Sequence, residues 1–384
     1  MQPSLLSDVV DRSHTVIVLG AGGVGKTSVS AGLALLAAIS GRKVLCLTID
    51  PARRLATSMG LDKLSGEPRR VSEELLASHG IIASGELYAM VLDKKRTFDD
   101  LVRSYAKDPE RQQRILDNRL YRYIATSLAG TQEYMAMEKL YAVREGNDYD
   151  LVVVDTPPSS DVFGFLDAPD VLIDAIDSPA TRWMLQALGR TGQFSLNIVT
   201  RGAATVLRGL SWLTGTQFMK EVAEFVGEFN ALFGGFRRRA THVREALRQQ
   251  EVSFLAVCSP SPPALSEVFN TMNLLAQRQL RTSAVIFNRV QLDPGACGSV
   301  TPNMLNDQFP QHPDLDGLLD RMRLAVQQEQ QRAGHDRMAI ERFREEAGDA
   351  CDLYVKVPLM PEDIHDLGGL AVLGRALLKP REKR

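Results

Sequence analysis

A glycine-rich segment near the N-terminus constrains the fold of this 384-residue chain more than any other feature. Residues 20–27 read GAGGVGKT, which is a complete G-x-x-x-x-G-K-[ST] phosphate loop. The apolar run at residues 15–19 predicts a buried strand before the loop, and residues 28–40 predict a helix after it that stops at Gly41. Strand, loop and helix together let backbone N–H groups and the helix N-terminus surround a polyphosphate.

The side chains of this loop predict how the ligand is held. Lys26 is expected to reach the β- and γ-phosphates, and the Thr27 hydroxyl is expected to ligate Mg²⁺. The predicted nucleotide-binding residues of the loop are Gly20, Gly22, Gly23, Val24, Gly25, Lys26, Thr27 and Ser28. We therefore expect a nucleoside triphosphate and Mg²⁺ at this site.

Short runs rich in valine, isoleucine and leucine alternate with helical segments along the chain. Such runs occupy residues 43–50, 87–92, 151–155, 254–258, 284–288 and 353–357. Continuous apolar runs are typical of strands covered on both faces, so we expect an α/β fold with a doubly wound, mostly parallel sheet. We expect residues 1–384 to form a single P-loop ATPase domain, with a flexible tail at 379–384.

Two stretches without strand signals, at residues 97–144 and 160–250, predict helical insertions that form a helical subdomain. In the second insertion, apolar residues recur at three- and four-residue steps between Phe218 and Phe236. This spacing predicts one apolar face on a long helix. That face either packs against neighbouring helices or shelters an apolar client.

Acidic residues follow two predicted strands, at the edge where parallel sheets bind their ligands. Asp155 ends an apolar run and is predicted to hold Mg²⁺ directly or through water; the alternative is a cap for the next helix. Asp50 is predicted to position the attacking water and to contact the metal; the alternative is a turn-forming Asp-Pro. Asp50 and Lys26 are thus the predicted catalytic residues, and residues 156–160 predict a switch that senses the γ-phosphate.

Composition and charge narrow the functional classes. A net charge of −2 gives no global attraction to nucleic acid or to acidic membranes. Residues 1–13 show no signal-peptide pattern. The four cysteines, which are Cys46, Cys258, Cys297 and Cys351, form no C-x-x-C, so we expect a reduced, cytoplasmic protein without a zinc clip.

The motifs resemble those of the ArsA family of ATPases, which includes the arsenite-pump ATPase and the targeting ATPase for tail-anchored membrane proteins. The resemblance covers nearly the whole chain and is carried by residues 20–27, 50–52, 130–133, 149–158, 288–289 and 357–359. It is most similar to the actinobacterial type, through LTIDPA at 47–52 and GTQEYMAMEK at 130–139. The resemblance implies the deviant Walker A class of P-loop proteins, ATP and Mg²⁺ as cofactors, and a dimer that closes on ATP.

The resemblance also implies roles for individual residues. Asp50 would orient the attacking water in switch I, and Asp155 would begin switch II. Asn288 and Arg289 would bind the nucleotide, with Asn288 recognising adenine. The segment that begins at Pro358 would close over the base.

One position of the loop departs from the family pattern. The family loop usually begins with lysine in KGGVGKT, and that lysine reaches the partner's nucleotide across the dimer; this chain has Ala21 there. A cation at such an interface stabilises the transition state as an arginine finger does. Either the chain hydrolyses slowly as a homodimer, or it forms a heterodimer with a lysine-bearing paralogue. In a third interpretation, Arg53 or Arg54 substitutes for the lysine.

The sequence therefore predicts a Mg²⁺-dependent, dimeric ATPase whose nucleotide state opens and closes a hydrophobic helical surface, for targeting or chaperoning of membrane proteins. The alternatives are an ATPase subunit that drives arsenite or anion export, and a low-activity ATP-binding partner of an active paralogue. Metalloid binding needs thiolates brought close together, whereas these cysteines are scattered. Residues 368–379 predict either a last helix docked on the sheet or an amphipathic helix in peripheral contact with a membrane.

Overall fold

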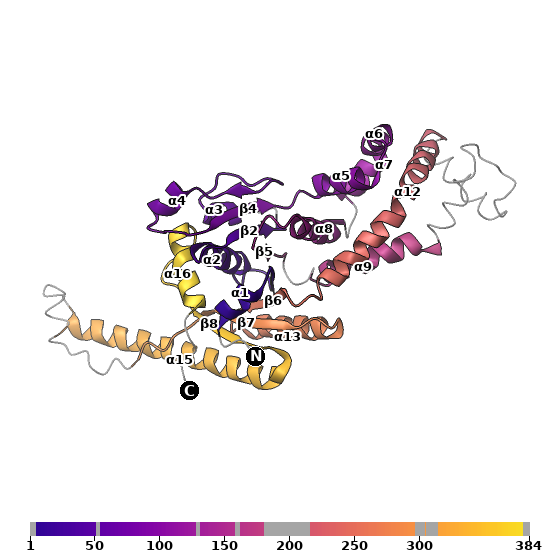
Figure 1. Cartoon of the computed structure of the whole chain (residues 1–384). Helices are drawn as coiled ribbons and strands as arrows, with labels where there is room; N and C mark the ends of the chain where they lie inside the picture. The colour runs from indigo at the N-terminus through magenta and orange to yellow at the C-terminus, as the bar shows by residue number, and fades with distance from the viewer. Residues whose placement is uncertain are drawn as a thin grey trace.

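The part of the chain that the structure describes is built around one eight-stranded sheet with helices on both faces (Figure 1). The computed structural model describes residues 5–50, 54–127, 131–157, 162–179, 216–295, 304 and 314–378. The strand order is β3-β4-β2-β5-β1-β6-β7-β8, and every pair is parallel except β3 with β4. The strands are β1 Thr15–Gly20, β2 Lys43–Thr48, β3 Arg69–Arg70, β4 Glu86–Val91, β5 Leu151–Asp155, β6 Val252–Cys258, β7 Thr282–Val290 and β8 Tyr354–Pro358. The predicted doubly wound, mostly parallel sheet is confirmed.

The helices fall into two groups. Those around the sheet are α1 Leu6–Arg12, α2 Lys26–Ile39, α3 Arg54–Ser58, α4 Glu73–Ser78, α8 Thr131–Gly146, α13 Pro262–Gln277, α15 Leu315–Ala347, the short 3₁₀ helix Gly348–Ala350 and α16 Leu367–Leu377. Those that gather beyond one side of the sheet are α5 Lys94–Tyr105, α6 Pro109–Asp117, α7 Arg119–Ser127, α9 Val162–Asp177 and α12 Thr216–Ala246. Figure 1 shows this second group at the side of the sheet opposite to the long helix α15.

The central strands bury side chains on both faces. In β1, Val16 and Val18 belong to the core formed with α2 and α16. The alternating residues Ile17 and Leu19 belong to the core on the other face, with α8 and the last turns of α12. All of these side chains are fully buried. Two-sided burial explains why the strand sequences are continuously apolar instead of alternating.

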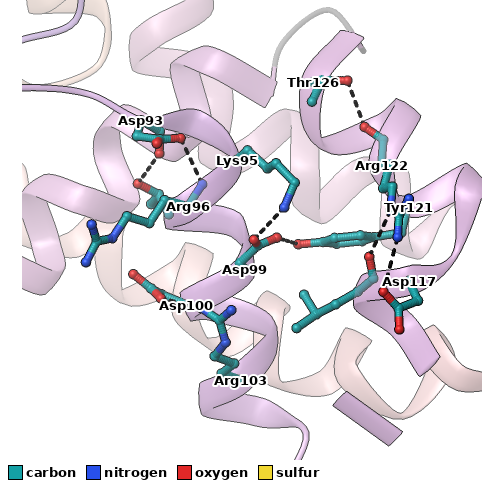
Figure 2. A network of polar contacts seen from close by, with 12 residues as sticks. Asp93, Lys95, Arg96, Asp99, Asp100, Arg103, Asp117, Tyr121, Arg122 and Thr126 are labelled. Atoms are coloured by element: carbon teal, nitrogen blue, oxygen red, sulfur yellow. Dashed lines mark hydrogen bonds and ion pairs between the residues drawn. The ribbon is translucent and has the colours of Figure 1, made fainter. Parts of the chain in front are cut away.

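The second group of helices, together with the neighbouring face of α8, forms a unit with its own core, called here the helical lobe. Phe98 of α5 stacks on Tyr121 of α7, and Phe236 of α12 packs against Phe98 and Tyr105 of α5. Figure 2 shows the polar contacts beside this core: Tyr121 Oη donates to Asp99 Oδ1 at 2.6 Å, and Lys95 Nζ donates to Asp99 Oδ2 at 2.6 Å. The bond from Tyr121 joins α7 to α5, whereas the bond from Lys95 lies within α5, and together they satisfy a buried carboxylate.

The predicted apolar face of the long helix lies on α12. Phe225, Leu232 and Phe236 are buried in the core of the helical lobe, and Phe233 packs against its margin. For these four residues the structure shows helix-to-helix packing, which leaves them out of any client-binding surface in this conformation. Residues 180–215 of the same predicted insertion lie outside the described part of the chain.

The last helix, α16, is docked on the sheet. Leu370, Leu373 and Leu377 are buried against the core that contains α2. Of the two arrangements predicted for residues 368–379, the structure shows the docked one. The leucine face that an amphipathic membrane helix would need is buried against the core. Within the described ranges, no helix has the length and apolarity required to cross a bilayer.

Candidate nucleotide site

A pocket of about 480 Å³ opens at the carboxyl edge of the sheet, between the glycine loop, the end of β7 and the loops that follow β2, β5 and β8. Its size is in the range of small-ligand sites. It is lined by Gly22, Gly23, Gly25, Lys26, Thr27, Ser28, Asp50, Arg54, Thr57, Ser58, Thr156, Arg289, Ile364 and His365. The structure thus brings most of the predicted loop residues together with Asp50 and Arg289.

Backbone geometry explains why glycine is required at two positions of the loop. A Cβ on Gly20 would lie 2.1 Å from the carbonyl oxygen of Val257 in the adjacent strand β6. Gly25 has φ +95° at the N-cap of α2, and a Cβ there would meet the Asn288 amide at 2.4 Å. Both residues therefore hold the chain in a conformation that a side chain would prevent. The loop then points the N-terminus of α2 into the pocket, where its N–H groups favour an anion.

Lys26 is folded back into the loop. Its Nζ donates to the carbonyl oxygens of Gly20 and Ala21, each at 2.7 Å. Burial lowers the pKa of Lys26, and the nearby Asp155 carboxylate opposes that shift. The ammonium group is thus placed inside the glycine loop by hydrogen bonds that a bound phosphate can replace.

Asp155 lies beneath the loop, at the end of β5. Its Oδ2 accepts hydrogen bonds from Thr27 Oγ1 at 2.9 Å and from Thr48 Oγ1 at 3.0 Å. Burial raises the pKa of Asp155 to about 6, although the two hydroxyl donors and Lys26 act in the opposite direction. The other oxygen, Oδ1, is buried and makes no hydrogen bond within the described residues.

These oxygens fit a magnesium ion. Hard cations take carboxylate and hydroxyl oxygens as ligands, and Mg²⁺ keeps several waters in nucleotide sites. The unpartnered Asp155 Oδ1 and the adjacent Thr27 hydroxyl supply such a donor set, either directly or through water. Asp50, the third predicted metal ligand, lines the same pocket.

The end of β7 also contacts the glycine loop. Asn288 Nδ2 donates to the carbonyl of Val24 at 2.8 Å, and Arg289 Nη1 donates to the carbonyl of Gly23 at 3.2 Å. Asn288 is buried and is not one of the residues that line the pocket. Pro358 pairs with Val290 in the sheet, so the predicted base-covering segment lies beside these residues.

Sequence reasoning missed part of the pocket wall. Thr57 and Ser58 come from α3, and Ile364 and His365 come from the loop between β8 and α16. No sequence motif marks these residues. The loop after β8 reaches the glycine loop only in the folded sheet. Arg54, one of the two arginines predicted as substitutes for the loop lysine, lines the pocket. Arg53 falls outside the described residues.

The thiols do not form a metalloid site within the described chain. Cys46 lies in β2 and Cys258 ends β6, and these strands are separated by β5 and β1. Three strand spacings place them roughly 14 Å apart. Both are fully buried, and burial raises the pKa of each thiol, to about 12 for Cys258. Cys351 is buried elsewhere, next to the beginning of β7, and Cys297 lies outside the described residues.

The parallel sheet, the glycine loop between β1 and α2, and the strand-end carboxylate under the loop define a P-loop nucleoside triphosphatase. Comparison with known proteins then identifies the family. Residues 13–303, more than half of the chain, match the family described as anion-transporting ATPase, and the chain belongs to this ArsA ATPase family.

Curated relatives agree with this assignment. The "ATPase GET3" of Podospora anserina is 25% identical over 292 residues, which cover 76% of this chain and 77% of that protein. The "ATPase get3" of Aspergillus terreus is 26% identical over 293 residues, again 76% of this chain and 77% of that protein. That of Schizosaccharomyces japonicus is 22% identical, covering 76% and 80%. The protein is therefore an ATP-hydrolysing enzyme.

Proposed function

We propose that this ATPase acts as a Mg²⁺-dependent dimer in the cytoplasm and shelters hydrophobic segments of membrane proteins during their targeting. ATP would bind in the pocket at the glycine loop. The nucleotide state of the protein would then control the conformation of the helical lobe. The observation that carries the proposal is the position of α9, which follows β5 in the chain and packs within the lobe.

The connection from the site to the lobe runs through Asp155 at the end of β5. After residues 158–161, which lie outside the described part, the chain continues as α9. This helix packs against both α8 and α12. Its Asp170 pairs with Arg244 of α12 at 2.7 Å, and its Asp167 pairs with Arg278, the C-cap residue of α13, at 2.5 Å. A displacement at the γ-phosphate edge would therefore reach α12 through α9.

The residues in the pocket support the chemistry of ATP hydrolysis. Lys26 would turn from the loop carbonyls to the β- and γ-phosphates, and Thr27 with Asp155 would hold Mg²⁺. Bound Mg²⁺ would supply positive charge at the β- and γ-phosphate oxygens. Asp50 would accept a hydrogen bond from the attacking water and keep it in line with the γ-phosphate. Asn288, Arg289 and Pro358 would form the nucleoside side of the site.

Two findings support a hydrophobic client. The relatives named GET3 match about three quarters of this chain. The family that the sequence resembles includes the targeting ATPase for tail-anchored proteins. On the lobe itself, Val171 of α9 is 58% exposed and Tyr123 of α7 is 62% exposed. Exposed apolar side chains on the lobe would offer docking points to an apolar helix.

The proposal is tested with the full chain and a model membrane protein that has one C-terminal transmembrane segment. The two are co-expressed, and the amount co-purified is measured with ATP and with a non-hydrolysable analogue. We expect capture that depends on Lys26, and a several-fold loss of capture in Val171→Asp with ATPase activity retained. Val372→Asp, at an exposed position of α16, is the matched control. Equal capture by Lys26→Ala and the wild type would contradict the proposal.

Ala21 favours a second candidate function, that of a low-turnover partner of a lysine-bearing paralogue. Ala21 is 6% exposed and presents only its carbonyl to Lys26. If the chain works as a heterodimer, the purified chain binds Mg·ATP and turns it over slowly, and the paralogue restores the rate. Affinity purification with the non-hydrolysable analogue distinguishes the two functions by the protein recovered, either a paralogue or a membrane protein.

A further inference from the structure

Helix α9 carries four aspartates that recur at steps of three and four residues, so they lie along one face of the helix. These residues, called here the acid ladder, are Asp167, Asp170, Asp174 and Asp177. Two rungs of the ladder pair with α12: Asp170 with Arg244 at 2.7 Å, and Asp177 with Arg237 at 3.2 Å. The earlier aspartate takes the later arginine, so the two helices run antiparallel where they meet.

The spacing of the acid ladder fits α12 in two registers. Seven residues separate the two paired aspartates, and seven separate the two arginines, which places each set on one helix face two turns apart. Asp167 and Asp174 have the same seven-residue spacing. If α9 slid by three residues toward its own C-terminus, Asp167 would reach Arg244. The same movement would bring Asp174 to Arg237. The slide is about 4.5 Å long and turns the helix by about 60°.

A separate ion pair selects the register that the structure shows. Arg278, the C-cap residue of α13, donates from Nε to Asp167 Oδ1 at 2.7 Å and from Nη2 to Asp167 Oδ2 at 2.5 Å. A bidentate bond of this kind is stronger than a single contact. Because α13 packs against β6 and β1, the bond holds α9 to the body of the sheet. Asp174 is exposed and forms no ion pair with the described residues.

The two registers differ little in their ion pairing. In each of them two aspartates of the acid ladder pair with α12, and the exchange costs only the bond to Arg278. The side chains of the two α9–α12 pairs are between 31% and 56% exposed, and exposed ion pairs contribute little to stability. A helix that has two discrete positions of similar energy is the kind of element that a ligand can shift by one turn.

We propose that α9 is a one-turn ratchet between the nucleotide site and the helical lobe. The bond between Asp167 and Arg278 holds the first register, and a nucleoside triphosphate in the site favours the second. The start of α9 follows β5, whose last residue, Asp155, lies beneath the glycine loop. In the second register α9 moves along α12 and carries the exposed Val171 with it, which changes the surface of the lobe. This inference rests on the proposed function and describes how the site would be coupled to the lobe.

The movement is measured as a distance between two spin labels, one at Val171→Cys in α9 and one at Asn273→Cys on the exposed face of α13. The described cysteines are buried, and Cys297 is replaced by serine. The labelled chain is diluted with unlabelled chain. With Mg²⁺ and a non-hydrolysable ATP analogue, the distance should change by several ångströms, up to about 4.5 Å. Arg278→Gln should show the changed distance without nucleotide, whereas Arg342→Gln, on an exposed face of α15, should not.

Nucleotide affinity gives a second readout, measured by titration calorimetry on the full chain. Asp174→Asn removes an ion pair of the second register alone, so it should weaken binding of the ATP analogue about threefold and leave the affinity for Mg·ADP unchanged. Arg278→Gln releases the first register, so it should strengthen binding of the analogue about fivefold. Asp349→Asn, at an exposed position of the short 3₁₀ helix, is the control for Asp174→Asn.

Failure of the ratchet is distinguishable from failure of the proposed function. If the wild type binds the analogue and the label distance stays the same, the ratchet is wrong and the nucleotide site stands. Equal weakening of both nucleotides by Asp174→Asn would also overturn the second register. If the wild type binds no nucleotide, the proposed function fails. The ratchet is then judged from Arg278→Gln, and a label distance equal to that of the wild type overturns it.

Discussion

Thr27 Oγ1 donates a hydrogen bond to Asp155 Oδ2 at 2.9 Å and so joins the beginning of α2 to the end of β5. The two residues are far apart in the sequence and meet because β5 is the parallel neighbour of β1. The same carboxylate oxygen accepts a second bond from Thr48 at the end of β2. The beginning of α2 and the ends of β2 and β5 are thereby fixed around one carboxylate, which leaves its other oxygen for a cation.

Asp155→Asn should lower Mg²⁺-dependent ATPase activity by about a hundredfold, the upper range for loss of a residue that holds or orients a metal. The amide keeps the size of the side chain but replaces one anionic oxygen with a donor. Activity is measured against Mg²⁺ concentration, and the concentration for half-activation should rise. Asp352→Asn, a carboxylate at the other edge of the sheet, is the control. An unchanged Mg²⁺ dependence would remove Asp155 from the metal site.

Ala21→Lys should raise the turnover of the purified chain at least tenfold, because transition-state cations in phosphoryl transfer are worth several decades in rate. The position is in the loop, and its carbonyl already accepts from Lys26. Ala21→Met, which is similar in length and has no charge, separates the charge from the added bulk. Steady-state ATPase assays compare the three proteins. A fast wild type that is unaffected by Ala21→Lys would contradict both the slow-homodimer and the heterodimer interpretations.

Tyr121→Phe should reduce the free energy of unfolding by about 2 kcal/mol, since hydrogen bonds to charged groups contribute roughly this much. Tyr121 is fully buried and donates to Asp99, so the change leaves one carboxylate oxygen without its donor (Figure 2). Tyr123→Phe, two residues along the same helix and 62% exposed, is the matched control. Urea denaturation of both variants measures the difference. Equal stability would show that the Asp99 contact contributes little.

The sequence predicted the parts of the fold that depend on local pattern. Continuous apolar runs gave the strands from β1 to β8 other than β3, which consists of two exposed residues and has no apolar signal. The glycine loop was visible because GAGGVGKT is contiguous. Asp50 and Asp155 could be placed beside the loop because parallel strands end at one edge, where their carboxylates gather, while their roles at the metal and the water stay predictions.

Other features depend on contacts between distant segments and could not be read from pattern. The same spacing in α12 suits a client surface or a lobe core, and only tertiary packing shows that Phe225, Leu232 and Phe236 face the core. The bulge that places Arg289 on the glycine loop leaves no mark in a run that reads as a regular strand. Ile364 reaches the pocket because β8 adjoins β7, which is likewise a property of the folded sheet.

The helical lobe contains a second buried carboxylate, Glu138 of α8. Its Oε1 accepts from Arg239 Nε of α12 at 2.8 Å, and the side chain is 5% exposed. Burial raises the pKa of Glu138 to about 7, although the ion pair with Arg239 opposes this. Its Oε2 makes no hydrogen bond within the described residues, consistent with burial being the larger effect.

Glu138→Gln should therefore flatten the pH dependence of stability. Between pH 4.5, the ordinary pKa, and pH 7 the native carboxyl binds more protons than the unfolded one, so stability falls as pH rises through this window. Glutamine keeps an acceptor for Arg239 and does not titrate. From pH 5 to pH 8 the variant should gain on the order of 3 kcal/mol relative to the wild type. Urea denaturation at several pH values measures this, with Glu341→Gln, on an exposed face of α15, as control. Parallel pH curves for Glu138→Gln and the wild type would show that Glu138 stays ionised in the folded lobe across this range.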